Sequence, residues 1–191
     1  ASRVVGRILF GARANLTARR KFAPRYLRNS LANLGAIRRG SRVDALENAW
    51  AGLPAVVVGA GPSLDAVLPV LADLAPRAVV IATDTSLRPL LHAGITPQVV
   101  VGADPSEQNA RHFFNLPPCD DTWLVAESAL DPRAAAAFAG RTAWFRVADH
   151  EPWPWFRTLG IDTAGLEMWG SVLTAAYQTA RLAGCDPIAF V

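Results

Sequence analysis

Five short apolar runs, each followed by a glycine or a carboxylate, set the tightest limit on how this chain can fold. They are VVVGAGPSLD (Val56 to Asp65), VVIATDTS (Val79 to Ser86), VVVGADPSEQN (Val99 to Asn109), TWLVAES (Thr122 to Ser128) and AWFRVADH (Ala143 to His150). The glycine or acid that ends one run lies 20 to 25 residues from the next, which is room for one strand and one crossover. This rhythm predicts an α/β fold with a mostly parallel sheet and flanking helices.

Turn residues and apolar spacing place the expected elements more closely. Strands are predicted at 55–58, 78–82, 98–101, 122–126, 142–145 and 187–191, and helices at 44–52, 63–74, 87–93, 105–113, 133–139 and 171–183. A proline-aromatic segment, Glu151 to Phe156, is expected to interrupt the alternation. Because ligands of open α/β sheets bind outside the carboxyl ends of the strands, the glycines and acids there predict one polar site. That site is typical of a nucleotide or phosphate ligand.

Charge is distributed unevenly along the chain. Residues 1–43 contain 11 Arg or Lys and no acid, whereas the remainder carries a net charge of −8. We therefore expect a basic, helical N-terminal segment at 1–47 and a nucleotide-binding domain at 48–191. The segment alternates apolar and basic positions, so it is expected to pack on the body or a partner, with binding to a polyanion as the alternative.

Composition excludes several other classes. The 191 residues, 51% of them hydrophobic, suffice for one buried core, and no apolar stretch is long enough for a membrane span. Cys119 and Cys185 are isolated, which favours reduced thiols in a cytoplasmic protein over disulfides or zinc ligands. The final strand is the last feature of the chain, so we expect the nucleotide-binding domain to be truncated at its C-terminus.

The turn at Gly59, Gly61, Pro62 and Ser63 is the strongest local signal. It follows a strand and opens a helix, so its glycines allow a ligand to approach the backbone and the helix start offers free amides to an anion. Leu64 replaces the third glycine of the dinucleotide fingerprint, which disfavours a generic NAD site. The alternative is a turn that needs glycine for its conformation, with Ser63 and Asp65 as ordinary capping residues.

Asp84 and Asp104 end neighbouring strands. Together they are candidate catalytic residues and candidate ligands of Mg²⁺, a cation that uses one or two carboxylates along with substrate phosphates. Thr85 adds a hydroxyl beside Asp84, in the place where a ribose-binding acid is expected. Capping of the following helix is the alternative for each acid.

The helix after Asp104 carries further polar side chains. Asn109 lies about one turn beyond Pro105 and is a candidate ligand-binding residue. Arg111 or His112 could neutralise phosphate charge, or they could form a solvated face, and Arg88 has the same two interpretations.

Gly170 and Ser171 open the last helix and offer a second anion-binding terminus, or else a simple N-cap. The aromatic residues near this point, Trp153, Trp155, Phe156 and Trp169, could stack on a flat ring or seal the edge of the sheet.

Three segments taken together resemble the 6-hydroxymethylpterin diphosphokinase MptE-like family. They are NAWAGLPAVVVGAGPSLD, ATDTSLRPLLHAGITPQVVVGADPSEQN and GSVLTAAYQTARLAGCDPIAFV, which together span about residues 48 to 191. The resemblance implies a Rossmann-like nucleotide fold and, in archaeal members, ATP- and Mg²⁺-dependent transfer of diphosphate to a pterin alcohol. Relatives also include motility accessory factors associated with glycosylation by nonulosonic acids.

Carried over by position, Gly59, Gly61, Pro62 and Ser63 would hold nucleotide phosphates, with Asp84 and Asp104 near the metal or ribose. Gly170 and Ser171 would line the opposite side of the crevice. The leading hypothesis is a transferase that moves diphosphate from ATP to a hydroxyl-bearing acceptor. The alternatives are a glycosyltransferase that uses a CMP-activated nonulosonic acid, and a noncatalytic nucleotide-binding module.

Overall fold

Eight parallel strands form one sheet in the computed structural model of the chain, which describes residues 22–147 and 152–191. Their order is β1-β6-β5-β4-β3-β2-β8, and β7 also pairs with β6. The strands are β1 (Ser41–Arg42), β2 (Ala55–Val58), β3 (Val79–Thr83), β4 (Val99–Gly102), β5 (Trp123–Glu127), β6 (Thr142–Arg146), β7 (Ala164–Gly165) and β8 (Ile188–Phe190). The predicted α/β class and mostly parallel sheet are confirmed.

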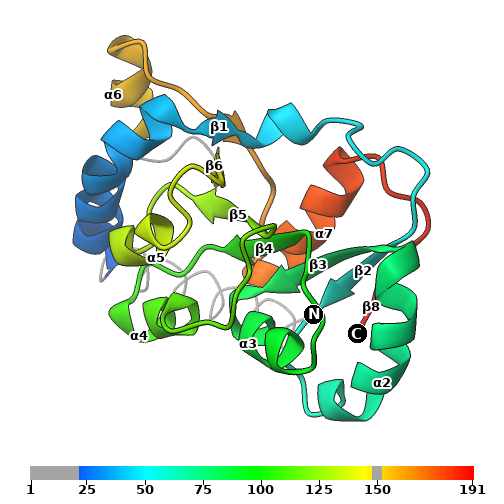
Figure 1. The fold of residues 1–191 in the computed structure, drawn as a ribbon. Helices are drawn as coiled ribbons and strands as arrows, with labels where there is room; N and C mark the ends of the chain where they lie inside the picture. The colour runs from blue at the N-terminus through cyan, green and yellow to red at the C-terminus, as the bar shows by residue number, and fades with distance from the viewer. Residues whose placement is uncertain (1–21, 148–151) are drawn as a thin grey trace, which may run out of the picture.

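Helices cover both faces of this sheet (Figure 1). They are α2 (Leu64–Leu74), α3 (Asp84–His92), α4 (Glu107–Ala110), α5 (Pro132–Ala136), α6 (Trp153–Thr158) and α7 (Val172–Leu182), with 3-10 turns η1 (Val43–Leu46), η2 (Ala75–Arg77) and η3 (Arg111–Phe113). An N-terminal helix at residues 22–39 precedes them.

Alternation along the strands determines which helices pack on which face. Val56 and Val58 of β2 belong to the cluster that includes Leu71 of α2 and Leu90 of α3. Val57 points to the other face, in the cluster that includes Ala176 of α7. Because side chains alternate across a strand, a run of consecutive apolar residues is needed where both faces are covered.

The order of connections places a switch point at β2. The chain advances one strand at a time from β2 to β6, and α7 then carries it back across the other face to add β8 beside β2. In open α/β sheets, the crevice at such a reversal is the usual ligand position. The carboxyl end of β2 is followed directly by the Gly59–Ser63 turn.

The structure adds the short strands β1 and β7, which the sequence did not predict, and it differs in two further places. The helix expected at 44–52 is only the η1 turn, because the N–H groups of Asn48, Trp50 and Gly52 donate to carbonyls of Leu182, Ala183 and Gly184 at the end of α7. Those bonds satisfy carbonyls that the helix terminus leaves unpaired.

The proline-aromatic segment is the second difference, since its residues from Trp153 onward belong to α6, while Glu151 lies outside the described residues. Trp153 and Phe156 are one helical turn apart and are both buried in the core, with their rings 5.3 Å apart at 85°. They therefore seal the structure and cannot stack on a ligand. Trp155 and Trp169 remain exposed.

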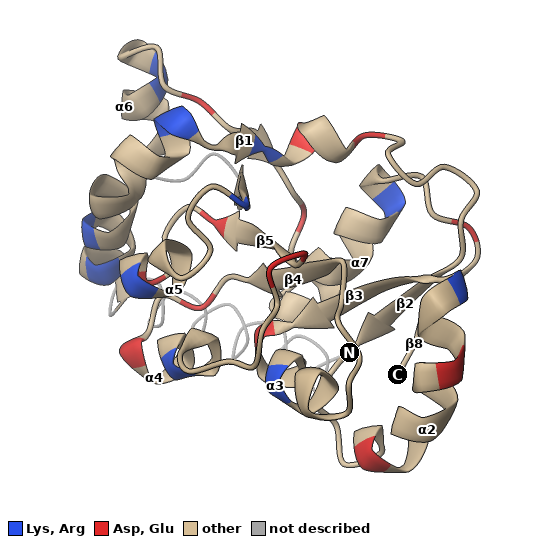
Figure 2. Cartoon of the chain, viewed as in Figure 1, with Lys and Arg blue, Asp and Glu red and all other residues tan. Residues whose placement is uncertain are grey.

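The N-terminal helix carries four arginines, two toward each of its ends (Figure 2). Its inner side nevertheless joins the body, with Ile37 in the core and Leu34 packed against it. Residues 1–21 of the predicted basic segment lie outside the described residues. Within residues 22–147 and 152–191, no helix combines the length and apolar character needed to cross a bilayer.

Gly102, the last residue of β4, tests how tightly the core is packed. A Cβ there would lie 2.9 Å from Phe113 Cζ and 3.2 Å from Leu130 Cδ1. We predict that Gly102→Ala lowers the free energy of unfolding by about 1–3 kcal/mol through overpacking. Urea denaturation measures the change. Gly165→Ala is the control, because a Cβ there would have an Arg146 side-chain atom at 3.7 Å as its nearest neighbour. Equal losses of stability in the two variants would contradict the tight packing around Gly102.

Candidate functional site

Hydrogen bonds fix the end of β2 against the start of α3. The Val58 carbonyl oxygen lies 2.7 Å from Ser86 Oγ and 3.2 Å from Thr83 Oγ1, and Thr83 N–H donates to Ser86 Oγ at 2.9 Å. Thr83 and Ser86 are both buried, so these bonds satisfy polar groups that water does not reach. The glycine turn and the Asp84 segment are therefore held beside each other.

The Gly59–Ser63 turn has an accessible backbone. Gly59 N–H donates to the Val191 carbonyl at 2.8 Å, while Gly61, Pro62 and Ser63 are exposed. Neither glycine has a left-handed φ, and a Cβ on Gly61 would have its nearest contact at 3.6 Å, with Ser63 Oγ. The side chain of Ser63 makes no capping hydrogen bond. Neither a left-handed φ nor a Ser63 capping hydrogen bond therefore accounts for these residues, and the lack of side chains on the two glycines leaves their backbone open.

The first turn of α7 lies beside this backbone. A Cβ on Gly59 would be 3.4 Å from Leu173 Cδ1, in the first turn of α7. Ser171 caps that helix by accepting the Leu173 N–H at 3.2 Å, and Gly170 takes a φ of +80°, which favours glycine. The N-termini of α2 and α7, on opposite faces of the sheet, thus both begin near Gly59, where their dipoles add positive potential.

Asp84 is buried in a polar cluster. Its Oδ2 accepts a hydrogen bond from Asn109 Nδ2 at 2.7 Å, and its Oδ1 accepts the Thr85 N–H at 2.8 Å. Burial raises the pKa of the Asp84 carboxyl, against the opposing effect of these two hydrogen bonds. The negative charge of Asp104 raises this pKa further, while His112 lowers it. The structure therefore brings Asp84, Thr85 and Asn109 into contact, with Asp104 near enough to act on them electrostatically.

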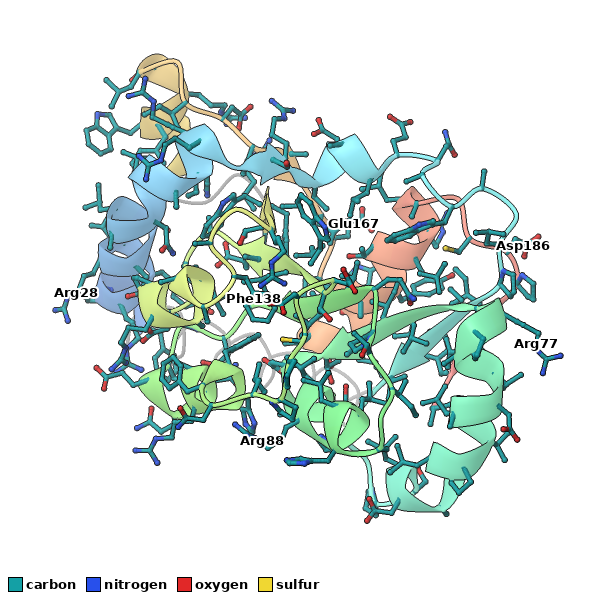
Figure 3. The ribbon with its side chains drawn as sticks, in the orientation of Figure 1. Arg28, Arg77, Arg88, Phe138, Glu167 and Asp186 are labelled. Carbon is teal, nitrogen blue, oxygen red and sulfur yellow. The ribbon has the colours of Figure 1, made fainter. Side chains whose placement is uncertain are left out.

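Asp104 is exposed and shapes the loop that follows β4. Its Oδ1 accepts the Ser106 N–H at 2.7 Å, and Ser106 Oγ in turn accepts the Asn109 N–H at 3.2 Å. The carboxylate thus organises the start of α4 while facing solvent. Arg88, which Figure 3 labels on α3, is occupied elsewhere, because its guanidinium donates to the carbonyls of Phe114 and Asn115.

These residues fit Mg²⁺ only in part. Both oxygens of Asp84 and one oxygen of Asp104 accept hydrogen bonds. No group of three or more acidic, His or Cys side chains suited to a metal occurs in residues 22–147 and 152–191. Because Mg²⁺ keeps several waters and uses one or two carboxylates with substrate phosphates, Asp104 is the better-placed ligand.

Glu127, at the end of β5, is a buried acid that the sequence analysis placed at a strand end without giving it a role. Its Oε1 accepts the Ser128 hydroxyl and its Oε2 accepts the Ala129 N–H, both at 2.7 Å. Burial raises its pKa to about 7, although these hydrogen bonds favour the charged form. Its strand-end position was visible in the sequence, whereas its burial was not. Asp149 and His150, at the end of the next run, lie outside the described residues.

An open hollow beside β8 contains none of the predicted site residues. It is lined by Tyr177, Arg181, Gly184, Cys185, Asp186, Ile188 and Phe190. The rings of Tyr177 and Phe190 lie 5.5 Å apart there, with the Arg181 guanidinium 5.9 Å from the Tyr177 ring.

Comparison with known proteins identifies the family. The sequence matches the family described as 6-hydroxymethylpterin diphosphokinase MptE-like over residues 28–191, a stretch that begins within the N-terminal helix. The chain belongs to this MptE-like family. No curated protein matches the chain.

A solved structure similar to this MptE-like chain is that of the MAf glycosyltransferase from Magnetospirillum magneticum AMB-1. The TM-score is 0.69 at 22% sequence identity, over 87% of this chain. This chain spans 26% of the length of that protein, so the likeness concerns the fold of one part. The family description and this neighbour's name both refer to group transferases.

The raised pKa of Glu127 predicts a pH dependence of stability. Between pH 4.5 and 7 the folded state holds this proton and the unfolded state releases it, so stability falls as pH rises through that window. The shift corresponds to about 3 kcal/mol. We predict that Glu127→Gln flattens this part of the profile of unfolding free energy against pH, as measured by urea denaturation. Parallel profiles for the two proteins would contradict the assignment.

Proposed function

We propose that this MptE-like chain is the nucleotide-binding part of a transferase and holds the phosphates of its donor at the Gly59–Ser63 turn. The observation that carries the proposal is the exposed backbone of this turn, beside which the N-termini of α2 and α7 both begin. Backbone amides and helix dipoles together favour an anion at such a position. The position is also the carboxyl edge of the sheet at its switch point.

The family description supports diphosphate transfer from ATP to an alcohol as the reaction. In that reaction the acceptor oxygen attacks the β-phosphorus, the bond from this phosphorus to the oxygen bridging the α-phosphate breaks, and AMP leaves with that oxygen while the acceptor's hydroxyl proton passes to solvent. No protein nucleophile is needed, because the attacking atom belongs to the acceptor. The chain's task is to position the reactants and to stabilise charge.

Each site residue has a distinct part in this proposal. The turn and Ser171 bind phosphate oxygens from the two sides of the crevice. Asn109 is oriented by its 2.7 Å bond to Asp84, so its amide keeps one position beside the donor. Asp104 would hold Mg²⁺ together with the substrate phosphates, and the cation would neutralise charge on the transferred group.

Glycosyl transfer from a CMP-activated acidic sugar is the second candidate. Hydrogen bonds to both oxygens of Asp84 favour this candidate. Of the two acids they leave only Asp104 well placed to bind the Mg²⁺ that diphosphate transfer from ATP would use. In this reaction the acceptor oxygen attacks the anomeric carbon, the bond from this carbon to the phosphate oxygen breaks, and CMP leaves with its single phosphate while the acceptor's hydroxyl proton passes to solvent. Backbone amides of one turn suffice for such a group. The name of the similar MAf glycosyltransferase agrees with this candidate.

Calorimetric titration with Mg²⁺-ATP and with CMP separates the two donors. Under the first candidate Mg²⁺-ATP binds and CMP does not, and the second candidate predicts the reverse. In either case we predict that Gly61→Val weakens nucleotide binding at least tenfold, because the added side chain occupies the approach to the backbone.

Gly165→Val is the matched control, since Gly165 is an exposed glycine without a left-handed φ, in β7, which pairs with β6 at the other end of the strand order. Nucleotide binding unchanged in Gly61→Val would overturn the proposed phosphate position. Replacing Asp84 and Asp104 by Asn should abolish turnover. A protein that binds nucleotide but never turns it over would instead be a binding module.

A further inference from the structure

The N-terminal helix is joined to the carboxyl edge of the sheet by two buried asparagines. Asn29 and Asn33 are 6% and 2% exposed, one helical turn apart on the inner side. Arg28 points away from the body (Figure 3). A buried amide is stable only if its hydrogen-bonding groups find partners, so the contacts of these two side chains show what the helix holds.

Both asparagines bind the loop after β5, and Asn29 also binds the loop after β4. Asn29 Nδ2 donates to the Pro105 carbonyl at 3.0 Å and to the Ala129 carbonyl at 2.9 Å, which links the loop after β4 to the loop after β5. Asn33 Nδ2 donates to the Ser128 and Leu130 carbonyls at 3.0 and 2.8 Å, both in the loop after β5. Asn29 alone of this pair reaches the loop that carries Asp104.

A continuous series of contacts runs from Asn29 to the buried acid of the site. Pro105 stands between Asp104 and Ser106, and the Asp104 carboxylate accepts the Ser106 N–H at 2.7 Å. Ser106 Oγ accepts the Asn109 N–H, and Asn109 Nδ2 donates to Asp84 Oδ2. The Pro105 carbonyl is therefore the point at which the N-terminal helix fixes the loop whose two ends hold Asp104 and Asn109.

We propose that Asn29 is a positioning residue for Asp104 and Asn109, so that the N-terminal helix is part of the site. The functional side of this inference rests on the proposed transferase function. Without the Asn29 amide, the carbonyls of Pro105 and Ala129 lose a shared donor and the two loops lose their link. The Asp104–Ser106 turn then shifts, and the Asn109 amide no longer keeps its place against Asp84.

The test compares Asn29→Ala with Asn33→Ala in the whole chain. Each substitution removes one buried amide that donates to two carbonyls, so comparable losses of stability are expected on urea denaturation. The side-chain amide resonances of Asn109, observed by ¹⁵N NMR, report the Asp84 contact directly. We expect Asn29→Ala to shift these resonances and Asn33→Ala to leave them near their wild-type positions. Asn29→Ser, which keeps one donor, should give a smaller shift and provides a folded variant if Asn29→Ala does not fold.

Turnover of the donor identified by calorimetry gives the second readout. We expect Asn29→Ala to lower kcat about tenfold with a smaller change in KM, and Asn33→Ala to change neither beyond twofold. Asn109 resonances that are unmoved in the Asn29 variants, or moved equally in Asn33→Ala, would overturn the positioning role whatever the reaction is. Shifted resonances in a protein that turns over neither donor would leave the positioning role standing and overturn the proposed function.

Discussion

The burial of the central strands on both faces is the constraint on which the rest of the molecule depends. β2, β3 and β4 are buried at every residue, between α7 on one side and α2 and α3 on the other. Polar side chains are disfavoured along such strands, because each buried polar group would need its own hydrogen-bond partner. Polar groups therefore lie where the strands end. At the carboxyl edge these groups are the exposed backbone of the Gly59–Ser63 turn and the side chains of Asp84 and Asn109.

Glycine serves two different purposes at this edge. Gly170 takes a left-handed φ that a side chain would strain, whereas Gly59 and Gly61 do not. At the latter two positions the useful property is the missing side chain, which leaves backbone exposed beside two helix N-termini. This distinction separates a turn that needs glycine for its shape from one that presents its backbone to a ligand.

Much of the sheet could be predicted from the sequence, since the mostly apolar runs of β2 to β6 are bounded by turn residues on both sides. Each central strand lies within one residue of its predicted limits. The segment at 44–52 failed because its N–H groups bond to the end of α7, a partner more than 130 residues away in sequence. The segment that forms α6 was missed because its prolines obscured the burial of Trp153 and Phe156 one turn apart. The acids of the site were visible as strand ends, but the burial of Glu127 and the two-loop contacts of Asn29 depend on tertiary structure.

We propose one position for the donor's phosphate, namely the backbone between β2 and α2, opposite the first turn of α7. The most direct measurement is the change in backbone amide resonances when nucleotide is added to ¹⁵N-labelled protein. We expect the largest shifts at residues 59–61, 63, 64 and 171–173, since Pro62 has no backbone N–H. The proposed phosphate position would be contradicted if these resonances stayed unchanged and the shifts occurred instead around Tyr177, Arg181 and Phe190, in the hollow beside β8.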